Sequence, residues 1–226
     1  MKTLEQDREM ILSELWSDDA EVRRKYRLRF DDCSQEFSDS MARAFVKWRA
    51  FDDGVQGDEK IAHVSALVYS AITLHILSLK LILSGQTIAA GSLFRQVVES
   101  IALALLCSGK DLRILQRFMD DKYSSHDAVG DVLRNAKTLS LNGEALRALR
   151  ESQRFYHQYS HITKMTIAIG MSLSDQGSLY VGASFDDGKI EAYTKEVHRR
   201  VSLAAVFANF VDGVTVNVGK WSAPNA

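Results

Sequence analysis

The chain has 226 residues, enough for one domain of ordinary size or two small ones. Its 28 basic and 29 acidic residues give a formal net charge of −1, which excludes a globally basic nucleic-acid binder, and 46% apolar residues exclude global disorder. Two cysteines, Cys33 and Cys107, are too few to build a disulfide framework or a zinc site by themselves. The only proline is Pro224, which favours long helices over a β-sandwich.

The first half of the chain predicts four helices. Apolar residues from Val22 to Trp48 recur at steps of three or four, the spacing of one stripe on an α-helix. Residues 51–57 contain two glycines and two aspartates and end that helix, and Asp58 is a suitable N-cap for the next one. We therefore expect helices over residues 3–16, 20–50, 58–83 and 86–108.

The second half predicts helices near 110–123 and 125–139, one from Glu144 to about 161 or 162, and a final one from about Lys189. Between residues 165 and 185, apolar residues alternate with small or polar ones on both sides of a turn, which predicts a β-hairpin. A lone hairpin is marginally stable, so we expect helices or a second protomer to cover its apolar face. That face contains Ile167, Ile169, Leu179 and Val181.

Together these elements predict an all-α fold: an antiparallel helical bundle with a small β-hairpin insertion near residues 165–185. The first eight residues carry charges where a signal peptide has an apolar core. The run from Ile61 to Leu79 contains no Lys, Arg, Asp or Glu, but its histidines and hydroxyl residues favour a buried helix over a membrane span. We therefore expect a cytoplasmic protein without membrane attachment.

Arg95 and Glu99 are the first residues that could carry chemistry. They are four apart, so they share a face of a helix that is otherwise apolar or small nearly all round. Opposite charges there are costly unless paired, so we expect both side chains to be buried and joined directly or through His161 or Tyr159. A buried ion pair that sets helix register is the favoured interpretation, and an anion-binding arginine held by a glutamate is the alternative.

Arg154, His157 and His161 form a second group. Arg154 and His161 are seven apart, which is two helical turns, and His157 falls between them, so we expect all three on one face. Imidazole can act as a general acid or base near neutral pH, and guanidinium can stabilise a phosphorane-like charge. A solvated or hydrogen-bonded cluster is an equally open interpretation.

Other polar features favour structural roles. The basic segment 23–29 could contact phosphates, but its acidic neighbours favour a solvated helix face with local ion pairs. His75 lies in an apolar helix and is expected to be a hydrogen-bonded core histidine. The sequence contains no P-loop, GxGxxG, CxxC, HExxH or GxSxG motif and no obvious set of metal ligands, so we expect neither a metal nor another cofactor.

The segments Phe94–Glu99 and Tyr159-Ser160-His161 together resemble HEPN-like all-helical proteins of bacteria. The branch in question has an arginine–glutamate helix followed, after two more helices, by a helix that ends in a Ser-His pair. The resemblance covers roughly residues 60–212. It implies a single domain, 1–226, in which a HEPN-like core over 58–212 carries an N-terminal helical extension over 1–50.

In HEPN ribonucleases an arginine and a histidine are separated by four to six residues, and Arg154 and His161 have six between them. The resemblance implies that Arg154 binds the scissile phosphate and His161 assists attack by the RNA 2′-hydroxyl, without a metal, in a homodimer. Phe155 departs from the pattern, since active members often have a polar residue directly after the arginine.

Two functions are therefore expected. The first is a non-catalytic binding or assembly module that takes a protein partner or an anionic ligand in a polar pocket. That pocket would be built around Arg95, Glu99, His157, Tyr159, Ser160 and His161. The alternative is a metal-independent endoribonuclease that uses Arg154 and His161 on RNA.

Overall fold

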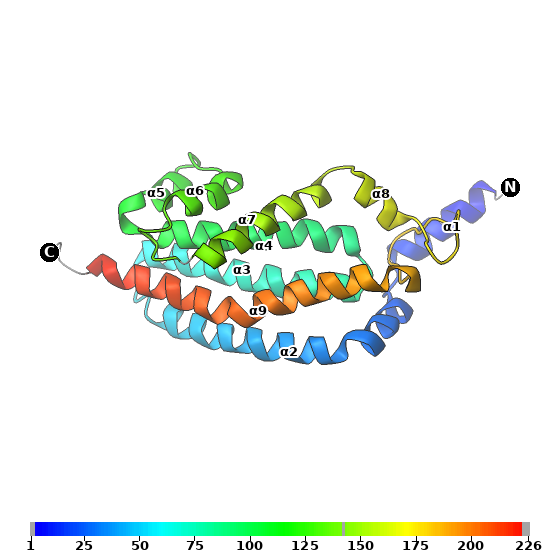
Figure 1. Cartoon of the computed structure of the whole chain (residues 1–226), viewed down its shortest axis with the longest axis horizontal. Helices are drawn as coiled ribbons and strands as arrows, with labels where there is room; N and C mark the ends of the chain where they lie inside the picture. Colours follow the sequence, from blue (N-terminus) through cyan, green and yellow to red (C-terminus); the bar gives the residue numbers. More distant parts are fainter. Residues whose placement is uncertain (1–2, 142, 223–226) are drawn as a thin grey trace.

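Four long helices lie side by side along the length of the molecule (Figure 1). The structure is a computed structural model, and it describes residues 3–141 and 143–222. The most extensive contacts join α3 to α4 and α2 to α9. The four helices are α2, Ala20–Asp53; α3, Glu59–Leu83; α4, Thr87–Ser108; and α9, Ile190–Gly219. The predicted all-α class is confirmed for the described residues.

Shorter helices cover one side of α4, among them α5, α6 and α7 (Figure 1). Helices α5 and α6 are shorter than predicted, because 3-10 turns at Lys110–Leu112 and Ser125–Asp127 take up part of each expected span. The shorter α-helices of the described chain are α1, Leu4–Leu15; α5, Ile114–Met119; α6, Ala128–Arg134; α7, Gly143–Tyr156; and α8, Lys164–Gly170.

Helix α2 follows the predicted apolar stripe and continues to Asp53. The helix bends at Phe30, where the backbone leaves helical geometry at φ −131° and ψ 21°. Its buried side chains pack against α9 and α3, so this part of the chain belongs to the same hydrophobic core as the residues after 58. These buried side chains include Tyr26, Phe30, Phe37 and Met41.

The predicted β-hairpin over 165–185 is wrong. Thr163 forms a reciprocal capping box with Thr166, which starts helix α8 where the first strand was expected. Beyond α8, one isolated antiparallel bridge joins Met171 to Leu179, and the residues that the structure describes form no strand. The alternating pattern is therefore carried by a helix and an irregular loop, because a local side-chain cap competes with strand pairing.

The described helices of the same chain do not bury the residues that were expected to form the hairpin's apolar face. Ile167, Leu179 and Val181 are all exposed, and Ile169 is partly buried. Since α8 turns its side chains around a helix axis, residues two apart no longer share a face.

Three helices are long and apolar enough to cross a membrane, judged by length and composition. They are Glu59–Leu83, Thr87–Ser108 and Asp187–Gly219, the last of which joins a 3-10 turn to α9. In the structure all three pack against one another, and each buries part of its surface in the shared core.

Asp186 holds the loop after α8 against the start of α9. Its side chain is buried, and its carboxylate accepts hydrogen bonds from the backbone amides of Leu173, at 2.6 Å, and Gly188, at 2.9 Å, and from the Ser174 hydroxyl. Burial raises the pKa of this carboxyl, but the hydrogen bonds from Ser174, Leu173 and Gly188 outweigh it and hold the pKa well below its ordinary value.

A buried ionic network lies where α9 meets α4 and α7. The Arg200 side chain is 0% exposed, and its Nη1 donates to the Glu196 Oε2 at 2.9 Å. Its Nη2 donates to the Ala90 carbonyl of α4 at 2.9 Å. The Tyr156 hydroxyl of α7 donates to the same Glu196 Oε2 at 2.8 Å, and Arg199 pairs with the other carboxylate oxygen at 2.6 Å. This set of residues, called here the Arg200 network, joins three helices.

His75 packs beside the Arg200 network and is a buried core histidine, as predicted. Its Nε2 lies 3.0 Å from the Arg200 carbonyl oxygen, which can only accept, so Nε2 carries the proton. Burial, followed by the charge of Arg200, lowers the pKa of His75 to about 3. The ring is therefore neutral, and it stacks on Phe207 at a centroid distance of 5.3 Å.

We predict that Glu196→Ala lowers the free energy of unfolding by about 3–5 kcal/mol, because it leaves the Arg200 charge buried without its partner. The double variant Glu196→Leu/Arg200→Met should lose much less, since it removes both charges. Glu191→Ala, at an exposed position of the same helix, is the control and should stay within about 0.5 kcal/mol of wild type. Urea denaturation measures all three, and an unchanged midpoint for Glu196→Ala would contradict the prediction.

We predict that Asp186→Asn lowers the free energy of unfolding by about 1.5–3 kcal/mol at pH 7, because hydrogen bonds to a charged carboxylate are lost. Since folding lowers the pKa of Asp186, its contribution is complete above the unfolded value of about 3.9 and falls as the pH drops through the folded value. The wild type and the variant should therefore converge in acid. Asp187→Asn, at the exposed neighbouring residue, is the control and should change stability little at any pH.

Candidate functional site

One stripe of α4 runs beneath residues 157–162, which connect α7 to α8. Its members are four, three and four residues apart, so they lie one above another on the helix. The Ser92 Oγ fastens the stripe to the connection by donating to the Tyr159 carbonyl oxygen at 2.9 Å. The stripe consists of Ile88, Ser92, Arg95 and Glu99.

A glycine lets this connection lie directly on α4. A Cβ atom at Gly91 would lie 2.1 Å from the Tyr159 ring, so a larger residue would displace the ring. The Tyr159 ring is buried and stacks on Tyr156, which belongs to the Arg200 network. Of the two predicted binding residues here, Tyr159 therefore anchors the segment, and Ser160 is exposed at the surface.

Arg95 and Glu99 are in direct contact at the C-terminal end of the stripe. The Arg95 Nε donates to the Glu99 Oε1 at 2.8 Å, and the two side chains are 15% and 12% exposed. They are joined directly rather than through His161 or Tyr159. The Arg95 Nη2 also donates to the His126 Nδ1 at 3.0 Å. Because a guanidinium has five N–H donors, these two bonds leave donors for a ligand.

His126 is a member of this site that sequence reasoning missed. It belongs to the 3-10 turn Ser125–Asp127, whose N-cap Ser124 accepts from the His126 amide. Gln153 of α7 donates to the His126 carbonyl oxygen at 3.2 Å, which ties this turn to α7. No local pattern could have linked His126 to Arg95, since they are 31 residues apart and meet only through packing on α4.

The structure brings His157 and His161 together. Both are exposed, and their rings meet edge to face at a centroid distance of 4.6 Å. Helix α7 ends at Tyr156, and residues 157–160 form a 3-10 turn, which advances about 120° per residue instead of 100°. The two-turn spacing therefore does not carry Arg154 onto one α-helical face with His161. Arg154 lies in the last turn of α7 and is exposed.

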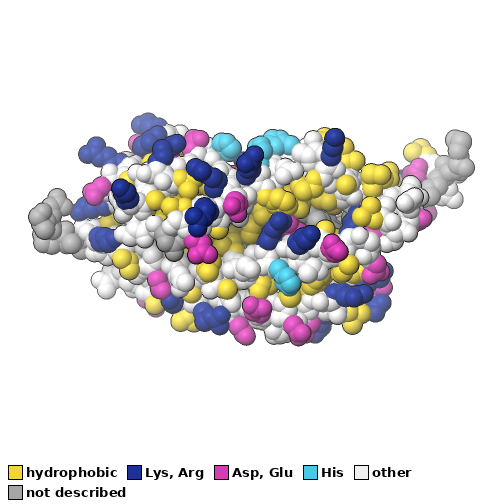
Figure 2. Space-filling view, viewed as in Figure 1, with side chains coloured by type: hydrophobic (Ala, Val, Ile, Leu, Met, Phe, Trp, Pro, Cys, Tyr) yellow, Lys and Arg dark blue, Asp and Glu magenta, His cyan; other side chains and the backbone are white. Residues whose placement is uncertain are grey.

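His157 also lies within electrostatic range of Arg95. Desolvation, followed by the charges of Arg95, His161 and His126, lowers the pKa of His157, and Glu99 opposes this effect. The neutral form of His157 is therefore favoured. We call Arg95, Glu99, His126, His157 and His161 the polar cluster. Figure 2 shows histidine side chains gathered along the upper edge of the molecule, between α6 and α8.

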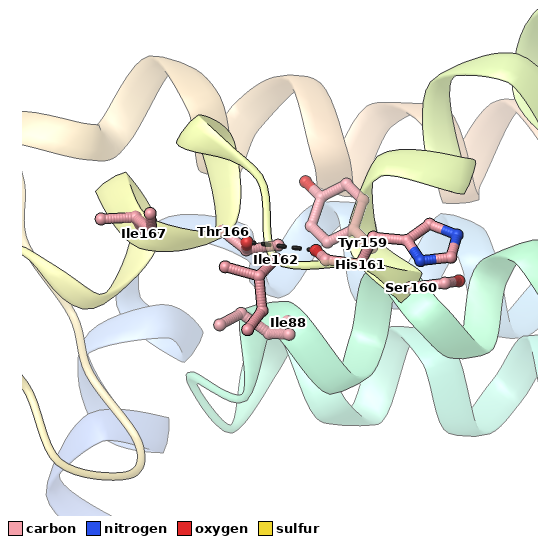
Figure 3. Close-up of a pocket in the computed structure, with 7 residues that line it drawn as sticks. All are labelled: Ile88, Tyr159, Ser160, His161, Ile162, Thr166 and Ile167. Atoms are coloured by element: carbon pink, nitrogen blue, oxygen red, sulfur yellow. Dashed lines mark hydrogen bonds between the residues drawn. The ribbon is translucent and has the colours of Figure 1, made fainter.

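A shallow, open pocket of about 410 Å³ adjoins the polar cluster. In Figure 3, Ile88 and Ile162 reach toward each other, and the imidazole of His161 lies on the opposite side, next to Ser160. The His161 carbonyl oxygen accepts from the Thr166 hydroxyl at 3.3 Å, which connects this wall of the pocket to α8. We call it the isoleucine pocket; its lining is Ile88, Tyr159, Ser160, His161, Ile162, Thr166 and Ile167.

The chemistry available at this site is that of a fixed cation beside titratable rings. Within residues 3–141 and 143–222, no group of three or more His, Cys, Asp or Glu side chains could hold a metal ion. Comparisons with family models, with curated proteins and with solved structures gave no match. Function is therefore inferred from the geometry of the polar cluster and its surroundings.

Proposed function

We propose that the protein is a non-catalytic, HEPN-like binding module that holds an anionic, phosphate-bearing ligand at the polar cluster. The observation that carries this proposal is the state of Arg95. Glu99 and His126 orient its guanidinium, which lies mostly below the surface, while at least one nitrogen has no partner among the described residues. An oriented, partly desolvated arginine is the side chain best suited to a phosphate.

The histidines beside Arg95 support the same proposal. At pH 7 a neutral imidazole can donate one hydrogen bond to a phosphate oxygen, and an anion bound nearby favours its protonated form. His157 and His161 are exposed and therefore accessible to a ligand. Glu99 balances the charge of Arg95, which offsets the cost of holding the guanidinium in a half-buried position.

The proposal includes an antiparallel bundle, a homodimer and a cytoplasmic location. The short connections at 54–58 and 84–86 support the antiparallel order, because so few residues join only neighbouring helices that run in opposite directions. Charged side chains occur along the whole length of the face in Figure 2, which supports a surface in contact with water. The homodimer rests on the resemblance to HEPN-like proteins.

We predict that methyl phosphate binds the wild type and that Arg95→Met weakens this binding at least tenfold. The reason is that a hydrogen bond to a charged group contributes about 1.5–3 kcal/mol. Isothermal titration calorimetry at pH 7 and low salt measures both. Arg147→Met, which removes an exposed arginine from α7, is the matched control and should bind like wild type. Equal affinity of wild type and Arg95→Met would contradict the proposal, as would no binding by either.

A second candidate function is the metal-independent endoribonuclease. The observation that favours it is the exposure of Arg154, His157 and His161, with the two imidazoles in contact. One ring could accept the proton of the 2′-hydroxyl while the other protonates the leaving oxygen. Arg154 would neutralise the phosphate.

If this second function holds, single-stranded RNA is cleaved in the presence of EDTA to a cyclic phosphate, and DNA stays intact because it lacks the 2′-hydroxyl. His161→Ala should reduce the rate by about 10²–10⁴-fold, the usual loss for a general acid or base. His198→Ala, which removes an exposed histidine from α9, should cleave like wild type. Cleavage that survives His161→Ala and Arg154→Ala would exclude this site as its source.

A further inference from the structure

The polar cluster and the isoleucine pocket share one stripe of α4 and one residue, His161. Both lie on the same stripe of α4, with Ile88 in the pocket and Arg95 in the cluster. His161 belongs to both, because it lines the pocket and its ring contacts His157. A ligand whose anionic group binds Arg95 therefore has an apolar surface within reach along the same stripe.

The pocket matches an aliphatic group rather than a nucleobase. Its exposed apolar side chains are Ile162, Ile167 and Ile88, which are 91%, 56% and 40% exposed. Bases bind single-stranded-nucleic-acid proteins by stacking on exposed aromatic rings. In this lining the Tyr159 ring is buried, and in Figure 3 the His161 ring points away from Ile88 and Ile162. Apolar side chains this exposed gain free energy when a hydrocarbon covers them.

We propose that the ligand is a phosphate monoester that carries an aliphatic chain, with its phosphate at Arg95 and its chain in the isoleucine pocket. This inference rests on the proposed function and names its ligand class. Ile88 and Arg95 are seven residues apart on one helix, so the two binding regions are roughly 10 Å apart along α4. A chain of several methylenes is needed to reach from one to the other.

The test is a titration of wild type with methyl, butyl and octyl phosphate, each in monomeric solution. Affinity should rise roughly two- to fourfold for each methylene that enters the pocket, because a buried methylene contributes about 0.8 kcal/mol. Ile162→Ser should bind methyl phosphate like wild type but lose most of the gain with chain length. Leu28→Ser, which removes an exposed leucine from α2, is the matched control and should keep the full gain. Arg95→Met should weaken all three ligands.

The outcomes separate this inference from the proposed function. If methyl phosphate binds through Arg95 but affinity does not change with chain length, the inference is overturned and the proposed function stands. If none of the three binds, both are overturned. If octyl phosphate binds equally well to wild type and Arg95→Met, the chain binds without the phosphate site, and the inference is again overturned.

A phosphate monoester that carries an aliphatic chain can be a free metabolite or a lipid. A second arm therefore measures co-sedimentation with phosphatidylcholine vesicles that contain phosphatidic acid. Binding of free octyl phosphate without vesicle binding identifies a soluble ligand. Vesicle binding that needs both Arg95 and Ile162 identifies a lipid phosphate. Retention on vesicles that survives both substitutions, in a protein that does not bind octyl phosphate, overturns the inference.

Discussion

The position of the candidate site depends on one buried charge, the Arg200 guanidinium. A cation with no exposed surface is tolerable only when ionic and hydrogen-bond partners surround it. Glu196 supplies the opposite charge, the Ala90 carbonyl oxygen accepts from the Arg200 Nη2, and the Tyr156 hydroxyl donates to the Glu196 carboxylate. Because these partners come from α9, α4 and α7, the network sets how those three helices meet.

The Arg200 network fixes the position of the end of α7. Tyr156 binds Glu196 through its hydroxyl, and the Tyr159 ring stacks on Tyr156 and lies against Gly91. The chain then leaves the helix at the surface, with His157 and His161 above the Arg95 stripe of α4. A buried structural network and an exposed polar cluster thus share one short segment. The segment is packed against the core on its buried side and accessible to solvent on the other.

Two of the charged pairs in the molecule show how similar sequence patterns have different consequences. Arg95–Glu99 and Glu196–Arg200 are both four apart on apolar helices. Arg200 lies at the centre of three packed helices, and its partners take up both terminal nitrogens. Arg95 lies where the cover of α4 is incomplete, between a 3-10 turn and the end of α7, so its guanidinium keeps access to solvent. The degree of burial therefore distinguishes a structural ion pair from a candidate ligand site, and the sequence spacing of the two residues does not reveal it.

Local periodicity and (i, i+4) geometry were enough to predict the all-α class and to place Arg95 and Glu99 on one helix face. They also predicted where each long helix starts, and where α2, α3 and α4 end, within a few residues. The sequence also held a signal for the Arg200 network: Arg200 falls on the apolar stripe with Tyr193, Val197 and Ala204. The structure showed that residues 164–170 are helical, which alternation did not predict because it does not reveal the local Thr163 cap. It alone brought His126 to Arg95 and placed the isoleucine pocket beside them. Those contacts join residues far apart in the chain, and they form only when the short helices pack on α4.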